Sequence, residues 1–284
     1  MASLAPATQA RLKILETLKS VTEGTRYYFG YQFGLGKEYI VPYLKANGVE
    51  FKGKAVCEIG CGEGGVLAAI ADEGVRSVLG IDIRQEAIDR AVALFDHLGI
   101  NPEHGIETEF DLHNITADGA PPKWKEKFDF VTLRDVIEHL DETEISLRNV
   151  MEFLKPGGYL YIVFPPYYSP FGAHQHLLKT LWGKLPWLQM LPNTIFNPLT
   201  SKAVHEIDIE EVSRLREIRL TIKKFKTAAK RAGLELKDEQ LYLLRPVFKM
   251  KFGINPIRGN FLKHLPGLRE LGALEASYLL QKPR

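Results

Sequence analysis

Cysteine is almost absent from the sequence, which contains only Cys57 and Cys61 among its 284 residues. The two lie four positions apart, and because a structural zinc site needs four ligands, this pair alone does not predict one. The pair also provides no disulfide framework of the kind that small secreted domains use. We therefore expect a protein of a reducing compartment, and specifically a cytoplasmic one.

Long apolar runs and an excess of one charge sign are lacking as well. The most apolar stretch, residues 177–195, is interrupted by lysines and by Pro186 and Pro192, so it does not predict a membrane span. Residues 1–10 lack the basic and then apolar pattern of a secretory signal. The 37 basic residues exceed the 35 acidic ones by two. Such a weak net charge does not predict nucleic acid as a partner.

An alternation of short apolar segments with amphipathic segments begins at residue 55. We expect an α/β fold in which a doubly wound, Rossmann-like, mostly parallel sheet is covered on both faces. A helix at 217–232 and strands at 234–244 and 278–280 would suit an antiparallel hairpin at the sheet edge. The remaining strands are predicted at 55–59, 77–81, 106–110, 128–133 and 159–164, and the helices between them at 64–73, 84–98 and 143–154.

Two segments fall outside this alternation. Residues 1–50 carry an amphipathic helix at 8–21 and an aromatic stretch at 27–34, which would form either a lid or part of the core. Residues 165–211 are too long and too apolar for a plain loop, and prolines break them repeatedly. We interpret this segment as an inserted substrate cap. The main domain would then comprise residues 51–164 and 212–284.

A glycine-rich loop follows the first strand of the alternation. Gly60, Gly62 and Gly65 spell the pattern G-x-G-x-x-G, and Asp82 ends the next strand, so the spacing alone fits a dinucleotide site. The charge argues otherwise, because Glu58 and Glu63 flank the loop and would repel a pyrophosphate. They suit a ligand with a cationic ammonium and a cationic sulfonium better. Asp82 could accept hydrogen bonds from both ribose hydroxyls under either interpretation.

The segment Val56-Cys-Glu-Ile-Gly-Cys-Gly-Glu-Gly64 resembles the first motif of class I S-adenosylmethionine-dependent methyltransferases. Four further segments, at 80–83, 110–112, 128–140 and 154–160, resemble later motifs of that family in the same order. The resemblance covers roughly residues 50–165 and implies S-adenosylmethionine as cofactor and a seven-stranded sheet with an antiparallel strand. The cofactor-binding residues predicted in this way are Glu58, Gly60, Cys61, Gly62, Asp82, Ile83, Asp111, Leu112, Arg134 and Asp135.

Two of these residues carry an alternative role. Arg134 and Asp135 follow the fourth strand at the carboxyl edge of the sheet, where ligands of open α/β sheets bind. Their backbone is expected to line the methionine part of the cofactor, whereas their side chains could equally form a surface ion pair of small energetic value.

Three histidines are candidates for catalysis. His139 could act as a general base, although a structural role fits the recurrence of Glu-His-Leu in this family better. His174 and His176 follow the fifth strand and could serve as a base, bind the acceptor, or simply fix the cap. No third metal ligand accompanies this His-x-His pair, so we predict no metal site. The substrate-binding prediction comprises both of these histidines and Tyr28, Tyr31, Tyr167 and Tyr168.

Together these features predict a methyltransferase that acts on a small, fairly apolar acceptor by in-line displacement. An NAD-linked oxidoreductase and a non-catalytic S-adenosylmethionine-binding module are the alternatives. Residues 177–187 mix apolar and basic side chains in the manner of an interfacial helix, so a weak contact of the cap with a membrane surface is a further hypothesis.

Overall fold

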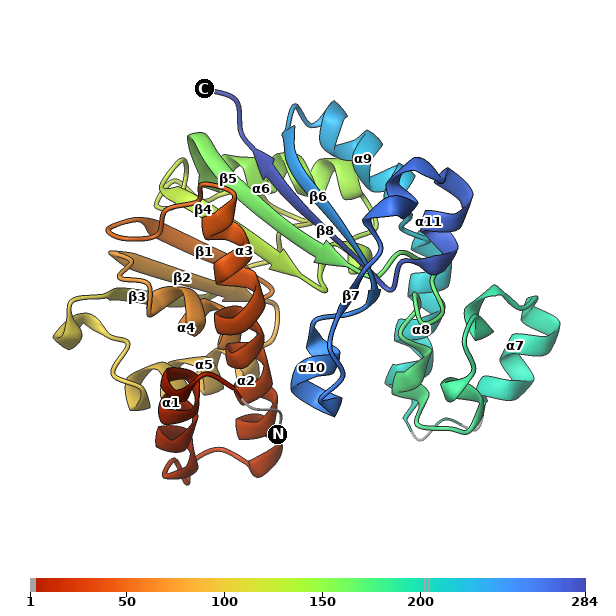
Figure 1. The fold of residues 1–284 in the computed structure, drawn as a ribbon, viewed down its shortest axis with the longest axis horizontal. Helices are drawn as coiled ribbons and strands as arrows, with labels where there is room; N and C mark the ends of the chain where they lie inside the picture. The colour runs from red at the N-terminus through yellow and green to blue at the C-terminus, as the bar shows by residue number, and fades with distance from the viewer. Residues whose placement is uncertain (1–3, 202, 204) are drawn as a thin grey trace.

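One eight-stranded sheet organises the chain. The computed structural model describes residues 4–201, 203 and 205–284. The strands lie side by side in the order β3-β2-β1-β4-β5-β8-β6-β7 (Figure 1). Their bounds are β1 (Ala55–Ile59), β2 (Ser77–Asp82), β3 (Glu107–Leu112), β4 (Phe128–Arg134), β5 (Leu154–Phe164), β6 (Glu235–Leu244), β7 (Ile257–Arg258) and β8 (Glu275–Gln281).

The C-terminal strand enters the sheet between two earlier strands. β1 to β5 pair in parallel, whereas β8 pairs antiparallel with both β5 and β6. The doubly wound, mostly parallel sheet with an antiparallel strand is therefore confirmed. The predicted seven strands are joined by an eighth, β7, which is only two residues long and pairs with β6. A pairing this short leaves no periodic pattern in the sequence.

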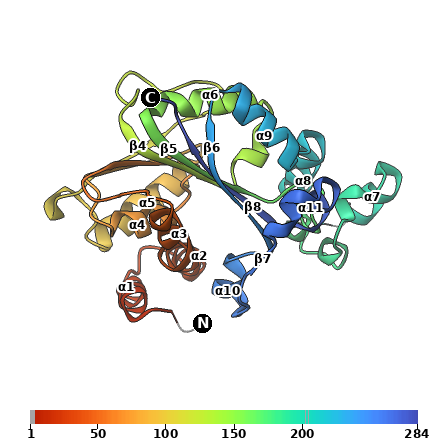
Figure 2. The same ribbon diagram turned by 45° about the horizontal axis from the view of Figure 1, so that its top comes forward.

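Helices cover both faces of the sheet, and Figure 2 shows α6 and α9 on one side and α3, α4 and α5 on the other. The alternation of side chains along each strand explains the two layers. Cys57 and Ile59 face α6 and α9, while Val56 faces α4 and α5. These helices are α3 (Val41–Ala46), α4 (Gly65–Ala71), α5 (Gln85–His97), α6 (Thr143–Phe153) and α9 (Ile222–Arg231).

The N-terminal segment forms a helical layer over the start of α4. It comprises α1 (Pro6–Glu16) and α2 (Glu23–Leu35), and the Thr22 side chain caps α2 by accepting from the Thr25 N–H. The predicted aromatic stretch lies within α2, where Phe29 and Phe33 are buried while Tyr27 and Tyr28 are exposed. The stretch therefore serves the core through one face of a helix.

The predicted helix at 217–232 is wrong in its extent, because two helices occupy this region. α8 (Glu206–Ile218) ends at Arg219, whose φ of 48° takes the left-handed conformation. Thr221 then starts α9 by accepting the Lys224 N–H. The charged surface of α8 hid this helix from the periodicity analysis.

The segment after β5 has a small core of its own. Tyr167, Leu178 and Phe196 are buried there together with Val212 and Leu215 from α8. Figure 1 shows this region, with α7 (Asn193–Thr200), projecting beside α8 and away from the sheet. α10 (Val247–Phe252) and α11 (Pro266–Gly272) complete the fold between β6 and β8.

Candidate active site

The glycine loop turns sharply between β1 and α4. Gly60, Gly62 and Gly64 have φ angles of 68°, 53° and 79°, which glycine adopts without strain. A Cβ on Gly60 would lie 2.4 Å from the Val136 side chain, so the loop after β4 presses against this turn. A Cβ on Gly62 would meet only the end of Arg84, at 4.0 Å. The loop is therefore closely supported on one side and open at Gly62.

Glu58 holds the loop to the helix that follows. It points to the α4 face of the sheet, and its carboxylate accepts the Leu67 N–H at 3.0 Å. Burial raises the pKa of Glu58 to about 8, although the Leu67 hydrogen bond opposes this rise. A donor in the first turn of α4, where a pyrophosphate would bind in a dinucleotide site, is thus already used by a carboxylate.

The second acid of the loop is neutralised. Glu63 accepts two hydrogen bonds from Arg90, at 2.8 and 3.0 Å. The positive charge of Arg90 offsets most of the negative charge of Glu63. The repulsion between Glu63 and a pyrophosphate is therefore weaker than the sequence predicts. Because burial also raises the pKa of Glu58, the argument against a pyrophosphate depends less on charge than on the Leu67 N–H that Glu58 already occupies.

Both cysteines are free and lie in the core. Burial raises the pKa of each thiol well above its ordinary value. The Cys61 thiol also donates a weak hydrogen bond to the Gly62 carbonyl at 3.6 Å. The Cys61 side chain therefore faces the core, and only its backbone could contact a cofactor at the open side of the loop near Gly62.

Asp82 links the loop to the end of β2. Its carboxylate accepts the N–H groups of Gly62 and Arg84, at 2.9 and 3.0 Å. Carboxylate oxygens have further lone pairs, so Asp82 can still accept hydroxyl donors. Ile83, the next residue, is 71% exposed. Its side chain is therefore available to a ligand held at Asp82.

The end of β3 offers a second apolar contact. Leu112 is also exposed, and the pairing of β2 with β3 places it next to Asp82 in register. Asp111 accepts a hydrogen bond from Lys123 at 2.8 Å, which lowers the pKa of this carboxyl. A flat ring could lie between these strand ends, while a ring amino group would compete with Lys123 for Asp111.

A chain of mostly half-buried charges follows β4. Arg134 donates to the side-chain Oε1 of Gln32 at 2.7 Å and pairs with Asp135 at 3.1 Å. Arg245 joins Asp135, at 2.6 Å, to Glu275, at 2.9 Å. Burial would raise the pKa of Asp135, but the two arginines outweigh it and hold this pKa below its ordinary value. The two side chains do form an ion pair, but it belongs to a half-buried network rather than to the open surface.

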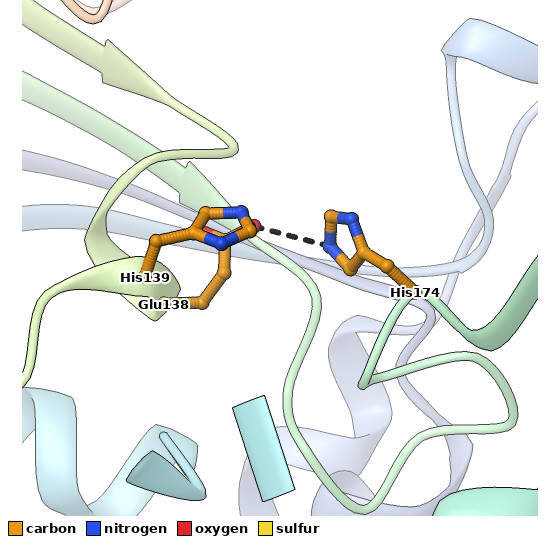
Figure 3. A group of neighbouring side chains, drawn as sticks. All are labelled: Glu138, His139 and His174. Carbon is orange, nitrogen blue, oxygen red and sulfur yellow. Dashed lines mark ion pairs between the residues drawn. The ribbon is translucent and has the colours of Figure 1, made fainter. Parts of the chain in front are cut away.

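Three residues converge just beyond this network, and Figure 3 shows the rings of His139 and His174 on either side of the Glu138 carboxylate. Glu138 Oε1 lies 3.3 Å from His174 Nε2 and 3.8 Å from His139 Nε2. His139 also contacts Glu211 of α8 through Nδ1. Burial lowers the pKa of His139, but Glu211 and Glu138 outweigh this effect and raise it.

The other predicted substrate residues are spread over several places. His176 stacks on His174. The residue is exposed overall, but desolvation of its ring and the neighbouring His174 lower its pKa to about 4. Tyr167 lies in the small core after β5 and donates to the Gln189 carbonyl oxygen at 3.0 Å, with Tyr168 packed against it. Tyr28 and Tyr31 pack together on α2, beside Arg134. The structure therefore does not gather the four tyrosines at one point.

Known proteins resemble this arrangement. A family model described as a methyltransferase domain matches residues 35–207, which is more than half of the chain. The chain belongs to this methyltransferase family. The fold, the family and S-adenosylmethionine as cofactor are thereby confirmed as predicted, and the oxidoreductase alternative is not favoured.

Individual relatives agree with this assignment to the methyltransferase family. A ubiquinone biosynthesis O-methyltransferase of Pseudomonas fluorescens is 33% identical over 113 residues, which cover 40% of this chain and 45% of the relative. The match thus spans less than half of that protein. A methyltransferase of Mesorhizobium loti that depends on S-adenosylmethionine has the same fold, with a TM-score of 0.53, 16% identity and coverage of 87% and 99%. A methyltransferase of Methanosarcina mazei that depends on S-adenosylmethionine also has this fold, with a TM-score of 0.51 and 19% identity. The alignment covers 85% of this chain and 97% of that protein.

Four residues of the methyltransferase site escaped the sequence analysis: Gln32, Glu138, Glu211 and Arg245. Glu138 could have been found, because it stands beside His139 in the fourth motif. The others are 72 or more positions away from the residues that they contact. No local pattern connects such distant positions.

Proposed function

We propose that this methyltransferase transfers the methyl group of S-adenosylmethionine to a small, fairly apolar acceptor by in-line displacement. The observation that carries the proposal is the loop that is open at Gly62 while Glu58 already occupies the Leu67 N–H of α4. This arrangement suits a cationic nucleoside better than a pyrophosphate. When bound, the cofactor supplies a methyl group activated by its sulfonium charge.

The residues around the loop divide the binding work in this proposal. Asp82 receives the ribose hydroxyls, and the exposed side chains of Ile83 and Leu112 flank the adenine. The backbone at Arg134 and Asp135 lines the methionine part. Asp135 has a φ of 53°, a strained value for a residue other than glycine that is frequent at functional sites.

The apolar side chains of the cap support a small, fairly apolar acceptor. A cavity of about 600 Å³ between α1 and α2, lined among others by Leu12, Tyr27 and Met250, contains no residue of the cap or of the glycine loop and therefore does not identify the acceptor site. The O-methyltransferase relative supports oxygen as the methylated atom. His139, oriented by Glu211, would hold or remove the proton of such a hydroxyl.

Calorimetric titration with S-adenosylmethionine and with NAD tests the cofactor site. We expect saturable binding of the former and none of the latter, and Asp82→Ala should weaken the binding at least about tenfold, which corresponds to one lost charged contact. Tight binding of NAD alone would refute the proposal.

Turnover is tested by incubating the protein with methyl-labelled cofactor and a panel of small phenols, alcohols and amines. Label in a hydroxyl compound is the expected result. Cofactor binding with no labelled product from a metabolite extract would favour the non-catalytic module instead.

We further propose that residues 165–211 act as the substrate cap, and that residues 51–164 and 212–284 bind the cofactor. The small core after β5 supports a separate cap, but Val212 and Leu215 of α8 belong to this core as well, so the structural boundary lies beyond residue 211. The cap also supplies His174 and Glu211 to the histidine cluster, whereas the glycine loop belongs entirely to the main domain. Substrate binding and cofactor binding would thus depend on different parts of the chain.

A weak contact of the cap with an anionic membrane surface is a second proposal. Residues 165–205 contain no aspartate or glutamate but three lysines, and Leu181, Trp182 and Trp187 are exposed there. Exposed tryptophan and leucine beside lysine are typical of interfacial binding. No helix within the described residues is long and apolar enough to cross a bilayer.

Co-sedimentation with vesicles of phosphatidylglycerol and of phosphatidylcholine tests this contact. We expect binding to the anionic vesicles, reduced by salt and by the double change Leu181→Asp and Trp182→Asp. Ile207→Asp is the matched control, since Ile207 is equally exposed but stands between Glu206 and Asp208. Equal loss of binding in the control would argue against Leu181 and Trp182 as the contact.

A further inference from the structure

Glu138 is a buried carboxyl group that accepts no hydrogen bond from the described residues, although two histidines face it. It is 2% exposed. Burial of a polar group without hydrogen bonds is costly, because the lost hydration is not replaced. His174 Nε2, which faces it, is also buried without a hydrogen-bond partner. Two polar groups of this kind aimed at one point indicate a missing ligand.

We propose that Glu138, His139 and His174 bind a divalent transition-metal ion. One atom from each of the three residues lies within 4.8 Å of the other two. Two ligand atoms at about 2.1 Å from one ion are about 3.0–3.4 Å apart at tetrahedral or octahedral angles. The 3.3 Å between Glu138 Oε1 and His174 Nε2 fits this spacing, and the 3.8 Å to His139 Nε2 needs only a small side-chain shift.

The outer contacts of the cluster match those of metal-binding histidines. Such a histidine usually offers one ring nitrogen to the ion and donates the other N–H to a carboxylate. His139 does this, since Nε2 faces Glu138 and Nδ1 contacts Glu211. His174 has a φ of 52°, so the backbone accepts strain where it directs this ring inward. Figure 3 shows both rings turned toward the carboxylate.

The donor set also indicates which ions fit. Two imidazoles and one carboxylate suit Zn²⁺, Fe²⁺ and Co²⁺ better than Mg²⁺ or Ca²⁺, which prefer oxygen ligands throughout. Three protein ligands leave coordination positions for a small molecule, as catalytic zinc sites do. The sequence analysis lacked this site because it sought a third ligand beside His174 and His176, whereas Glu138 comes from the loop after β4.

The position of the cluster suggests a use, which depends on the proposed methyl transfer to oxygen. Val136, two residues before Glu138, contacts Gly60 of the cofactor loop. A hydroxyl oxygen of the acceptor bound at the ion would lose its proton to water more easily, and His139 would then serve as a metal ligand in place of the base suggested above. That oxygen then forms the bond to the methyl carbon, and the carbon–sulfur bond breaks with its electron pair remaining on sulfur.

Titration of the tag-free protein with Co²⁺ tests the site by visible absorption and calorimetry, without an acceptor. We expect one saturable site that Zn²⁺ displaces. Glu138→Gln and His174→Ala should each weaken binding at least about tenfold, and Glu211→Gln by about 10–100-fold. His176→Ala is the matched control, because its ring stacks on His174 but lies outside the cluster, and it should bind as the wild type does.

Circular dichroism checks that each variant is folded, and His174→Ala decides the result if Glu138→Gln is unfolded. Absence of a saturable Co²⁺ band in the wild type, or unchanged binding in the folded variants, would overturn the proposal. Titration of the same samples with S-adenosylmethionine separates the two hypotheses. Binding of S-adenosylmethionine without binding of Co²⁺ would contradict the metal site alone. Binding of Co²⁺ without binding of S-adenosylmethionine would contradict the proposed function alone.

Discussion

The acidic residues Glu58 and Asp82 have structural roles at this site that their negative charge alone does not predict. Glu58 is an acid beside a predicted cation site, yet its carboxylate is turned to α4, where it satisfies a helix donor. Asp82 likewise accepts two backbone N–H groups of the turn before any ligand is considered. Both acids therefore hold the loop in place through hydrogen bonds to backbone N–H groups, in addition to any contact with a ligand.

The buried Glu58 should make stability depend on pH. Its pKa is raised from 4.5 to about 8 by burial, so the folded state binds the proton more tightly than the unfolded one. The stabilisation is complete below pH 4.5 and is lost as the pH rises through 8, by at most about 5 kcal/mol. Urea unfolding at pH 5 and pH 8.5 should show this loss in the wild type and a smaller one in Glu58→Gln.

Glu235→Gln serves as the control for this experiment, because Glu235 is exposed. It should keep the pH dependence of the wild type. An identical pH dependence in Glu58→Gln would show that Glu58 is not the group responsible.

At the level of elements, the helix α2 decides the shape of the site. It packs on α4 so closely that Gly65 has no room for a side chain. The same helix brings Gln32 to Arg134, so the N-terminal segment supports the charge network after β4. The third glycine of the fingerprint is thus explained by helix packing rather than by a ligand.

Gly65→Ala should therefore destabilise the protein. Its Cβ would lie 2.6 Å from Gln32 Cβ and 2.7 Å from the Phe29 carbonyl oxygen. Overpacking of this kind costs about 1–3 kcal/mol, which urea unfolding can measure. Gly267→Ala, in α11, has no atom within 4 Å of the new Cβ and should cost nothing comparable. Equal stability of the two variants would mean that α2 does not pack against α4 in solution.

The whole molecule combines a sheet with helices on both faces and a cap that has its own small core. The cap reaches back to the main domain through Glu211 on His139 and His174 on Glu138. Local opening of the cap should be easier than global unfolding, because few apolar residues hold it.

Phe196→Ala tests this independence. Phe196 is 1% exposed in the cap core, and the change should cost about 3–5 kcal/mol within the cap. We expect faster amide exchange in residues 165–201 and lost turnover, with the affinity for S-adenosylmethionine nearly unchanged. Phe225→Ala, in the main core, should instead lower global stability. A loss of cofactor affinity in Phe196→Ala with a folded main domain would contradict the division.

The sequence by itself determined the alternating fold, the glycine loop and the cofactor family, because strand periodicity, turn glycines and strand-end acids are local patterns. The tertiary structure alone decided which face of β1 carries Glu58, how the half-buried arginines pair, and that β8 enters between β5 and β6. It also joined Glu138 to His174, 36 positions later, in the proposed metal site. Such contacts depend on how distant segments pack, and no spacing along the chain encodes them.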